Sequence, residues 1–148
     1  MKSIGKLLRF VRYSKYKPLL IRAFFLSARY RRMILKYSDH TTELQKRFGV
    51  EGQESPDKEP VEVYRYAHRV SYAVNTICSR TAWESKCLVR ALVAQHLLKR
   101  KKINSTMYLG CRREEEKMVA HAWIRCGEMY VSGGNGEGYG MVAKFTAF

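Results

Sequence analysis

Apolar residues repeat at helical spacing in the middle of the chain. In the segment 61–78 they recur every three or four positions, which predicts an amphipathic helix. The apolar positions of this helix are Val63, Ala67, Val70, Val74 and Ile77. The same spacing continues from Ser85 to about Lys101, where the cluster of cations at 99–102 suits the C-terminal end of a helix dipole. We therefore predict two consecutive helices here.

The period of the pattern changes after residue 105. Four short segments are rich in aromatic or β-branched residues and are separated by turn-prone or charged residues, which predicts strands. They span residues 106–111, 118–126, 129–132 and 141–145. Because the helices come first and the strands last, we predict an α+β fold in which helices pack on one face of an antiparallel sheet.

The N-terminal part differs in composition from the rest. Residues 1–36 carry eleven Lys or Arg and no Asp or Glu, and thus most of the formal net charge of +15. Apolar residues at 4, 7, 8 and 11, and again at 20, 24 and 28, predict two basic amphipathic helices separated near Lys17 and Pro18. Segment 49–60 is rich in Gly, Pro and acidic residues. We expect a basic helical segment 1–48, a linker 49–60 and one core 61–148.

The charge of the N-terminal segment favours an anionic neighbour. A solvated cationic face, docking on a partner protein or acidic peptide, and a minor contact with a membrane surface all fit this composition. Nucleic acid is not an expected partner, since no DNA- or RNA-reading motif occurs. Arg22 interrupts the apolar run 19–26, and the four cysteines are irregularly spaced. We expect a cytoplasmic protein with free thiols and with no metal or cofactor.

Cys87 and His121 are the candidate catalytic residues. Cys87 opens the second predicted helix, where Ser85 is the expected N-cap and the unpaired backbone N–H groups of the first turn stabilise a thiolate. If Thr81 is instead the cap, with Glu84 completing a capping box, Cys87 falls in the second turn and this effect weakens. The alternative role, a small buried thiol, is what we expect of the remaining cysteines, Cys78, Cys111 and Cys126.

His121 lies in a predicted strand, where its ring requires a hydrogen-bonding partner. The Cys87 thiol is one candidate, and a third group usually holds the imidazole of such a pair. If a hairpin turn centres on Gly127 and Glu128, His121 faces Gly134 across the strands. The nearest polar side chains are then Ser132 and Asn135. We favour Asn135, acting through its amide oxygen, with a backbone carbonyl as the alternative.

Several motifs carry a resemblance to a known family: residues 87–92, 97–100, 108–111 and 120–123. Residues 61–148 resemble the transglutaminase-like cysteine peptidases of lasso peptide biosynthesis, the B-protein leader peptidases related to the microcin J25 processing protein. The resemblance implies a papain-like core and a Cys-His-Asp triad, with Cys87 as nucleophile and His121 as base. Gly133 stands where many members carry the aspartate.

The resemblance also implies a function. A stand-alone member cleaves the leader from a lasso peptide precursor through a Cys thioester and works with a separate leader-binding recognition protein. The macrolactam synthetase is a further candidate partner. The backbone N–H of Cys87 and the tryptophans Trp83 and Trp123 are the candidate oxyanion or substrate contacts. The alternatives are a basic peptide- or membrane-binding adaptor with structural Cys and His, and an acyl transferase of transglutaminase type.

Overall fold

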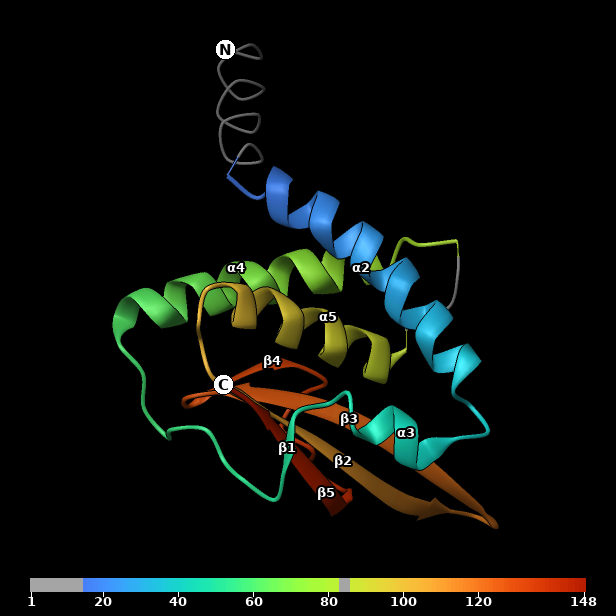
Figure 1. Cartoon of the computed structure of the whole chain (residues 1–148). Helices are drawn as coiled ribbons and strands as arrows, with labels where there is room; N and C mark the ends of the chain where they lie inside the picture. The colour runs from blue at the N-terminus through green and yellow to red at the C-terminus, as the bar shows by residue number, and fades with distance from the viewer. Residues whose placement is uncertain (1–14, 83–85) are drawn as a thin grey trace.

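The computed structural model describes residues 15–82 and 86–148 (Figure 1). Along this part of the chain the elements are α2 (Lys17–Lys36), α3 (Thr41–Gln45), β1 (Val50–Glu51), α4 (Val61–Cys78), α5 (Cys87–Arg100), β2 (Ser105–Glu114), β3 (Lys117–Cys126), β4 (Met129–Ser132) and β5 (Gly140–Ala147). Figure 1 shows α4 and α5 covering one face of the sheet, with α2 lying across them on the side away from the strands. The predicted α+β fold is confirmed.

The main helices follow the apolar periodicity closely. Helix α4 has the predicted bounds, and α5 starts at Cys87, two residues after the predicted start. Helix α2 starts at Lys17 with a proline in its first turn, where the missing N–H of proline costs nothing. The helix predicted around residues 4–11 lies outside the described residues.

Antiparallel pairing orders the described strands as β1-β5-β2-β3-β4. Strands β2 and β3 pair along almost their whole length, from Thr106 opposite Arg125 to Glu114 opposite Lys117. Strand β4 is short and pairs only with the C-terminal end of β3, so the N-terminal half of β3 has no β4 partner. On this side, β3 therefore has no ladder partner next to His121.

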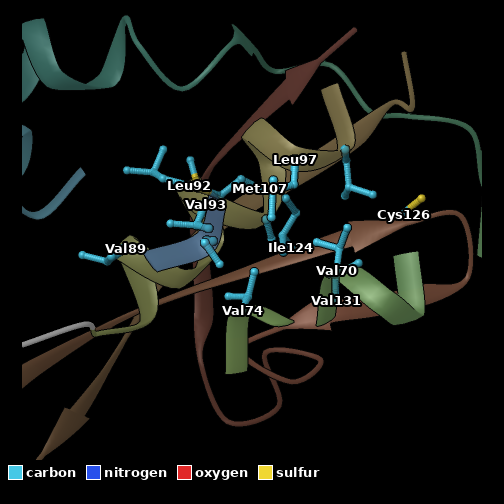
Figure 2. Close-up of a cluster of buried hydrophobic side chains, with 14 of the residues drawn as sticks. Val70, Val74, Val89, Leu92, Val93, Leu97, Met107, Ile124, Cys126 and Val131 are labelled. Atoms are coloured by element: carbon cyan, nitrogen blue, oxygen red, sulfur yellow. The ribbon is translucent and has the colours of Figure 1, made fainter. Parts of the chain in front are cut away.

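The hydrophobic core lies between the helices and the sheet. In Figure 2, Val70 and Val74 of α4 lie close to Leu97 of α5 and to Met107 and Ile124 of the sheet. All five side chains are completely buried. Burial of a side chain of this size contributes roughly 1.5–3 kcal/mol, so this layer holds α4 and α5 on the strands.

Helix α2 is packed onto this core and is not a free extension. Its Ala23 and Ser27 are fully buried, and Tyr30 Oη lies 3.0 Å from Nδ1 of His96 on α5. Burial, with a smaller contribution from Arg29, lowers the pKa of His96. The neutral His96 ring can therefore accept the hydrogen bond from Tyr30.

The segment 49–60, predicted as a linker, is fixed to the sheet. Its residues Val50 and Glu51 form β1 against β5. Farther along, the backbone N–H of Ser55 donates to Thr106 Oγ1 (2.8 Å). The guanidinium of Arg125 donates to Glu54 Oε2 (2.8 Å) and to backbone oxygens of the segment. These bonds tie the segment across the sheet face that the helices leave uncovered.

Glu54 should make stability depend on pH. Burial alone would raise the pKa of Glu54, but hydrogen bonds from Tyr108, Lys144 and Arg125 outweigh burial and hold this pKa below its usual value. A carboxyl group whose pKa is lower in the folded chain than in the unfolded chain stabilises the fold. This stabilisation is complete above the ordinary pKa of 4.5 and is lost as the pH falls through the pKa of Glu54 in the folded protein. In urea unfolding, Glu54→Gln should lower the midpoint at pH 6 and should have a smaller effect at pH 3.5.

Glu116→Gln, on the exposed turn between β2 and β3, is the matched control and should change neither midpoint. If Glu54→Gln lowered the midpoint equally at both pH values, the charge of Glu54 would not be the source of the effect.

Candidate active site

Cys87 is the first residue of α5, and Lys86 occupies the N-cap position. The first hydrogen bond of this helix runs from Arg90 N–H to the Lys86 carbonyl (3.1 Å). The backbone N–H groups of residues 87–89 precede it and form the positive end of the helix dipole. Cys87 is therefore in the first turn, as predicted, but the N-cap is Lys86 and not the expected Ser85. The alternative with Thr81 as cap, which places Cys87 in the second turn, is wrong.

Three residues that the sequence singled out lie just before Cys87. Ser85, the expected cap, Glu84 of the alternative capping box and Trp83, the candidate oxyanion donor, all lie outside the described residues. The candidate oxyanion contact that the structure does describe is the backbone N–H of Cys87, at the start of α5.

The four cysteines are free but differ in their surroundings. Cys78 and Cys126 are buried, as expected, whereas Cys111 is partly exposed like Cys87, so the expectation that Cys111 is buried is wrong. Burial, helped by the charge of Glu59, raises the pKa of Cys126 to about 11, so this thiol stays protonated at neutral pH. Cys111 lies within strand β2, away from any helix start. Cys87 alone among them combines partial exposure with a helix N-terminus.

A backbone carbonyl holds His121. Its Nε2 lies 2.6 Å from the carbonyl oxygen of Gly133. A carbonyl oxygen only accepts hydrogen bonds, so Nε2 must carry the proton and donate it. In the neutral ring the lone pair is then on Nδ1, which leaves that nitrogen available to take a proton from a thiol.

A column of aromatic rings fixes the orientation of the imidazole. The His121 ring stacks on Tyr139, with centroids 4.7 Å apart, and lies 6.0 Å from Trp123 on its own strand. Trp123 stacks in turn on Tyr108 at 5.5 Å. At the other end, the guanidinium of Arg112 lies 4.7 Å from the centre of the Tyr139 ring. Trp123 thus supports the column, and its role in substrate contact stays a prediction.

The strand pairing next to His121 differs from the pairing expected for this hairpin, and so does the group that holds the imidazole. The turn at Gly127 and Glu128 is confirmed, because Cys126 pairs with Met129. Val131 is then an extra residue on β4, so Ile124 pairs with Ser132 and the ladder ends there. The expected pairing of His121 with Gly134 is therefore wrong.

Neither predicted side chain contacts the imidazole through a hydrogen bond. The amide oxygen of Asn135 accepts from the backbone N–H of Glu137 (3.0 Å), which closes a local turn. Ser132 Oγ is buried and has no hydrogen-bonding partner among the described residues. The alternative that the sequence left open, a backbone carbonyl, is the one observed, and it belongs to the residue that replaces the expected aspartate.

Gly133 suits this role because it has no side chain. Its φ of +79° is in the left-handed region, and a Cβ there would overlap the carbonyl oxygen of Ala122. The backbone of Gly133 thus lies so close to β3 that a side chain would push it away. This close approach brings the carbonyl within reach of His121.

Cys87 and His121 lie at the same level along the strands. Helix α5 joins β2 through the short turn 101–104 and runs in the opposite direction to β2 (Figure 1). Its 14 residues span about 21 Å. At about 3.3 Å per residue, the same length of strand reaches from Ser105 to about Gly110. Gly110 pairs with His121, so the start of α5 is at the level of the imidazole.

The two side chains approach β3 from different faces. Ala122 and Ile124 are buried in the core under the helices, so alternation directs His121 to the opposite face. In the described structure no hydrogen bond joins Cys87 to His121. Beyond Ser132 the edge of β3 has no strand partner on this side, and the loop that carries Gly133 and Tyr139 lies there, against Ala122 and the imidazole. Pairing of the thiol with the ring around this edge stays a prediction.

The described part of the chain contains neither a cluster of metal-ligating side chains nor a membrane-spanning helix. Within residues 15–82 and 86–148, no three His, Cys, Asp or Glu side chains come together as a metal site. In the same part of the chain, no helix has both the length and the apolar composition needed to cross a bilayer.

Comparison with known proteins points to a family and to no individual relative. A family model described as Transglutaminase-like superfamily matches residues 40–147, most of the chain. No curated protein and no solved structure matches. The matched region contains both Cys87 and His121 and also includes β1 and the segment 49–60.

Gly133→Ala should displace the carbonyl from His121. Gly134→Ala is a matched control, because Gly134 also has a positive φ (+71°) but a Cβ there would meet no atom within 4 Å. Both changes cost roughly 1–3 kcal/mol of backbone strain. Only Gly133→Ala adds the overlap with Ala122, so its urea midpoint should fall further, and the Nε2 proton of His121 should exchange faster in NMR spectra. Equal behaviour of the two variants would contradict the assigned hydrogen bond.

Proposed function

Since the chain belongs to the transglutaminase-like superfamily, which includes cysteine peptidases, we propose that it cleaves the leader peptide from a lasso peptide precursor. The family match supports membership of a superfamily that includes cysteine peptidases. Leader cleavage is supported by the motifs at 87–92, 97–100, 108–111 and 120–123, since they resemble the leader peptidases of lasso peptide biosynthesis.

One observation carries the chemistry. The Cys87 thiol lies in the first turn of α5, and the Nε2 of His121 is fixed on the Gly133 carbonyl (2.6 Å). The helix start favours a thiolate, and the fixed tautomer leaves Nδ1 to receive the thiol proton. Cys87 is thus the proposed nucleophile and His121 the proposed base.

The proposed reaction proceeds through a thioester. The Cys87 thiolate attacks the carbonyl carbon of the last leader residue, and the backbone N–H of Cys87 stabilises the oxyanion. The peptide C–N bond then breaks, and His121 gives its proton to the departing amine of the core peptide. Water, deprotonated by His121, attacks the thioester and releases the leader with a free carboxylate and Cys87 as a thiol.

The Gly133 carbonyl replaces a carboxylate in this scheme. A neutral carbonyl sets the tautomer as a carboxylate does, but it stabilises the imidazolium ion less, because hydrogen bonds between charged groups are roughly twice as strong as neutral ones. We therefore propose an enzyme in which positioning of the ring, more than its charge, supports the base. The aromatic column around His121 supplies that positioning.

The proposal includes a compartment and partners. The described cysteines are free, which fits the reducing cytoplasm. A separate recognition protein would bind the leader and deliver the precursor to Cys87, and the macrolactam synthetase would act on the released core peptide.

The direct test combines the purified chain with a precursor and a recognition protein encoded beside its gene and follows the peptide masses over time.

An acyl transferase would use the same thioester, with an amine replacing water. Adding a primary amine to the assay separates the two activities. Release of the free leader acid at an unchanged rate supports the peptidase, whereas exclusive formation of a leader amide would establish the transferase.

Cys87→Ala should abolish leader cleavage without unfolding the protein. Cys111→Ala, at the other partly exposed thiol, is the matched control and should retain activity. The readouts are peptide mass spectrometry for cleavage and thermal unfolding for the fold. Full cleavage by Cys87→Ala would remove the peptidase assignment and would favour an adaptor with a structural cysteine.

His121→Ala and Asn135→Ala should differ in severity. Loss of the base should lower the cleavage rate by roughly 100-fold or more. Asn135 does not touch the ring but holds the Glu137 N–H in the loop that carries Tyr139, so its loss should reduce the rate only partly. Single-turnover rates of cleavage measure both. Equal losses for the two variants would place Asn135 in direct contact with the imidazole during catalysis.

A further inference from the structure

A groove runs along the exposed side of α2. One wall is a stripe of the helix that carries Phe25, Arg29, Arg32 and Lys36, at spacings of three and four residues. The opposite wall is formed by two residues that follow the helix, Tyr37 and Arg47. Ala28 and Met33 complete the lining.

The groove has strong positive charge and no acidic residue. Arg29, Arg32, Lys36 and Arg47 line it, and no Asp or Glu does. The neighbouring Glu43 pairs with Lys46 (2.6 Å) and also feels the charge of Arg47. Within residues 15–82 and 86–148 no carboxylate forms an ion pair with any of the four cations. Like charges held together raise the free energy of the folded chain, and an anionic partner would relieve this repulsion.

Arg47 is held ready for a ligand. Its Nη2 donates to Tyr37 Oη (2.8 Å), and its guanidinium carbon lies 4.7 Å from the centre of the Tyr37 ring. A guanidinium fixed in this way still has free N–H groups in a planar fork, which matches the two oxygens of a carboxylate. Little side-chain entropy remains to be lost when such a group binds.

The groove also has an apolar component. Phe25 is 66% exposed at one end, and Met33 offers a flexible apolar surface within it. A ligand that matches the groove must therefore present acidic groups together with an apolar side chain. A concave site with a preset carboxylate fork fits a segment of polypeptide better than it fits the broad surface of a bilayer.

We propose that this groove binds an acidic segment of a partner polypeptide through its carboxylates and one apolar side chain. No residue of α5 lines the groove, so the segment would bind at a site other than the first turn of α5, which carries Cys87. The proposal does not depend on peptidase activity, and its test uses binding alone.

The experiment measures fluorescence anisotropy of short labelled peptides with the full chain. The first peptide has Glu and Asp on both sides of one Leu. The second replaces this Leu with Gly, and the third replaces the acidic residues with their amides. The first peptide should bind, the second should bind roughly tenfold more weakly, and the third should not bind measurably. Affinity for the first peptide should fall as salt is added.

Variants locate the site on the protein. Arg32→Glu combined with Lys36→Glu should weaken binding of the first peptide by roughly tenfold or more. Lys99→Glu combined with Lys102→Glu makes the same change in net charge on other exposed residues and should have little effect. Phe25→Ser should remove the preference for the peptide with Leu. Cys87→Ala should bind as the unchanged protein does, which separates this site from the proposed active site.

Thermal unfolding of each variant checks that the fold is intact. Equal weakening by the two charge-reversal pairs would overturn the proposal, because binding would then depend only on the net charge of the protein. The proposal would also be overturned if the protein bound vesicles of phosphatidylglycerol and phosphatidylcholine, or single-stranded RNA, more strongly than the first peptide and if this binding depended on Phe25.

Discussion

The hydrogen bond from His121 Nε2 to the Gly133 carbonyl determines what the candidate active site can do. At 2.6 Å it sets the tautomer of the imidazole and leaves Nδ1 as the basic nitrogen. Its existence depends on two backbone features. Strand β4 ends at Ser132, and the next residue is a glycine that adopts a positive φ close against β3. With a side chain at position 133, the carbonyl would not reach the ring.

Packing supplies the other half of the site. The turn 101–104 and the core formed by Leu97, Met107 and Ile124 fix α5 along the sheet, which places the first turn of α5 level with His121. The helix that carries the thiol covers one face of β3 and the imidazole lies on the other, and beyond the short β4 the edge of β3 is lined by the loop with Gly133 and Tyr139. Helix α2, packed on the outer side of α4 and α5 (Figure 1), carries the cationic groove, whose lining includes neither Cys87 nor His121.

The sequence predicted the parts of the fold that have a strong apolar period. Helix α4 matched its predicted bounds, since five apolar positions at helical spacing define one face. Strand β1 and helix α3 were missed, because two and five residues are too short for a period and depend on tertiary contacts. The orientation of His121 was only partly predictable. The extra residue Val131 in β4 shifts the hairpin register, and no pattern of side chains signals a backbone carbonyl as partner.

The most direct measurement asks whether the thiol and the imidazole meet. A bifunctional reagent such as 1,3-dibromoacetone alkylates a reactive thiol and then bridges to a histidine only if the ring is in near contact. Peptide mapping by mass spectrometry after treatment of the native protein should identify a covalent bridge between Cys87 and His121, and urea-unfolded protein should not form it. Alkylation of Cys87 without a bridge, or a bridge to His40, His68 or His96, would contradict the pairing on which the proposed chemistry rests.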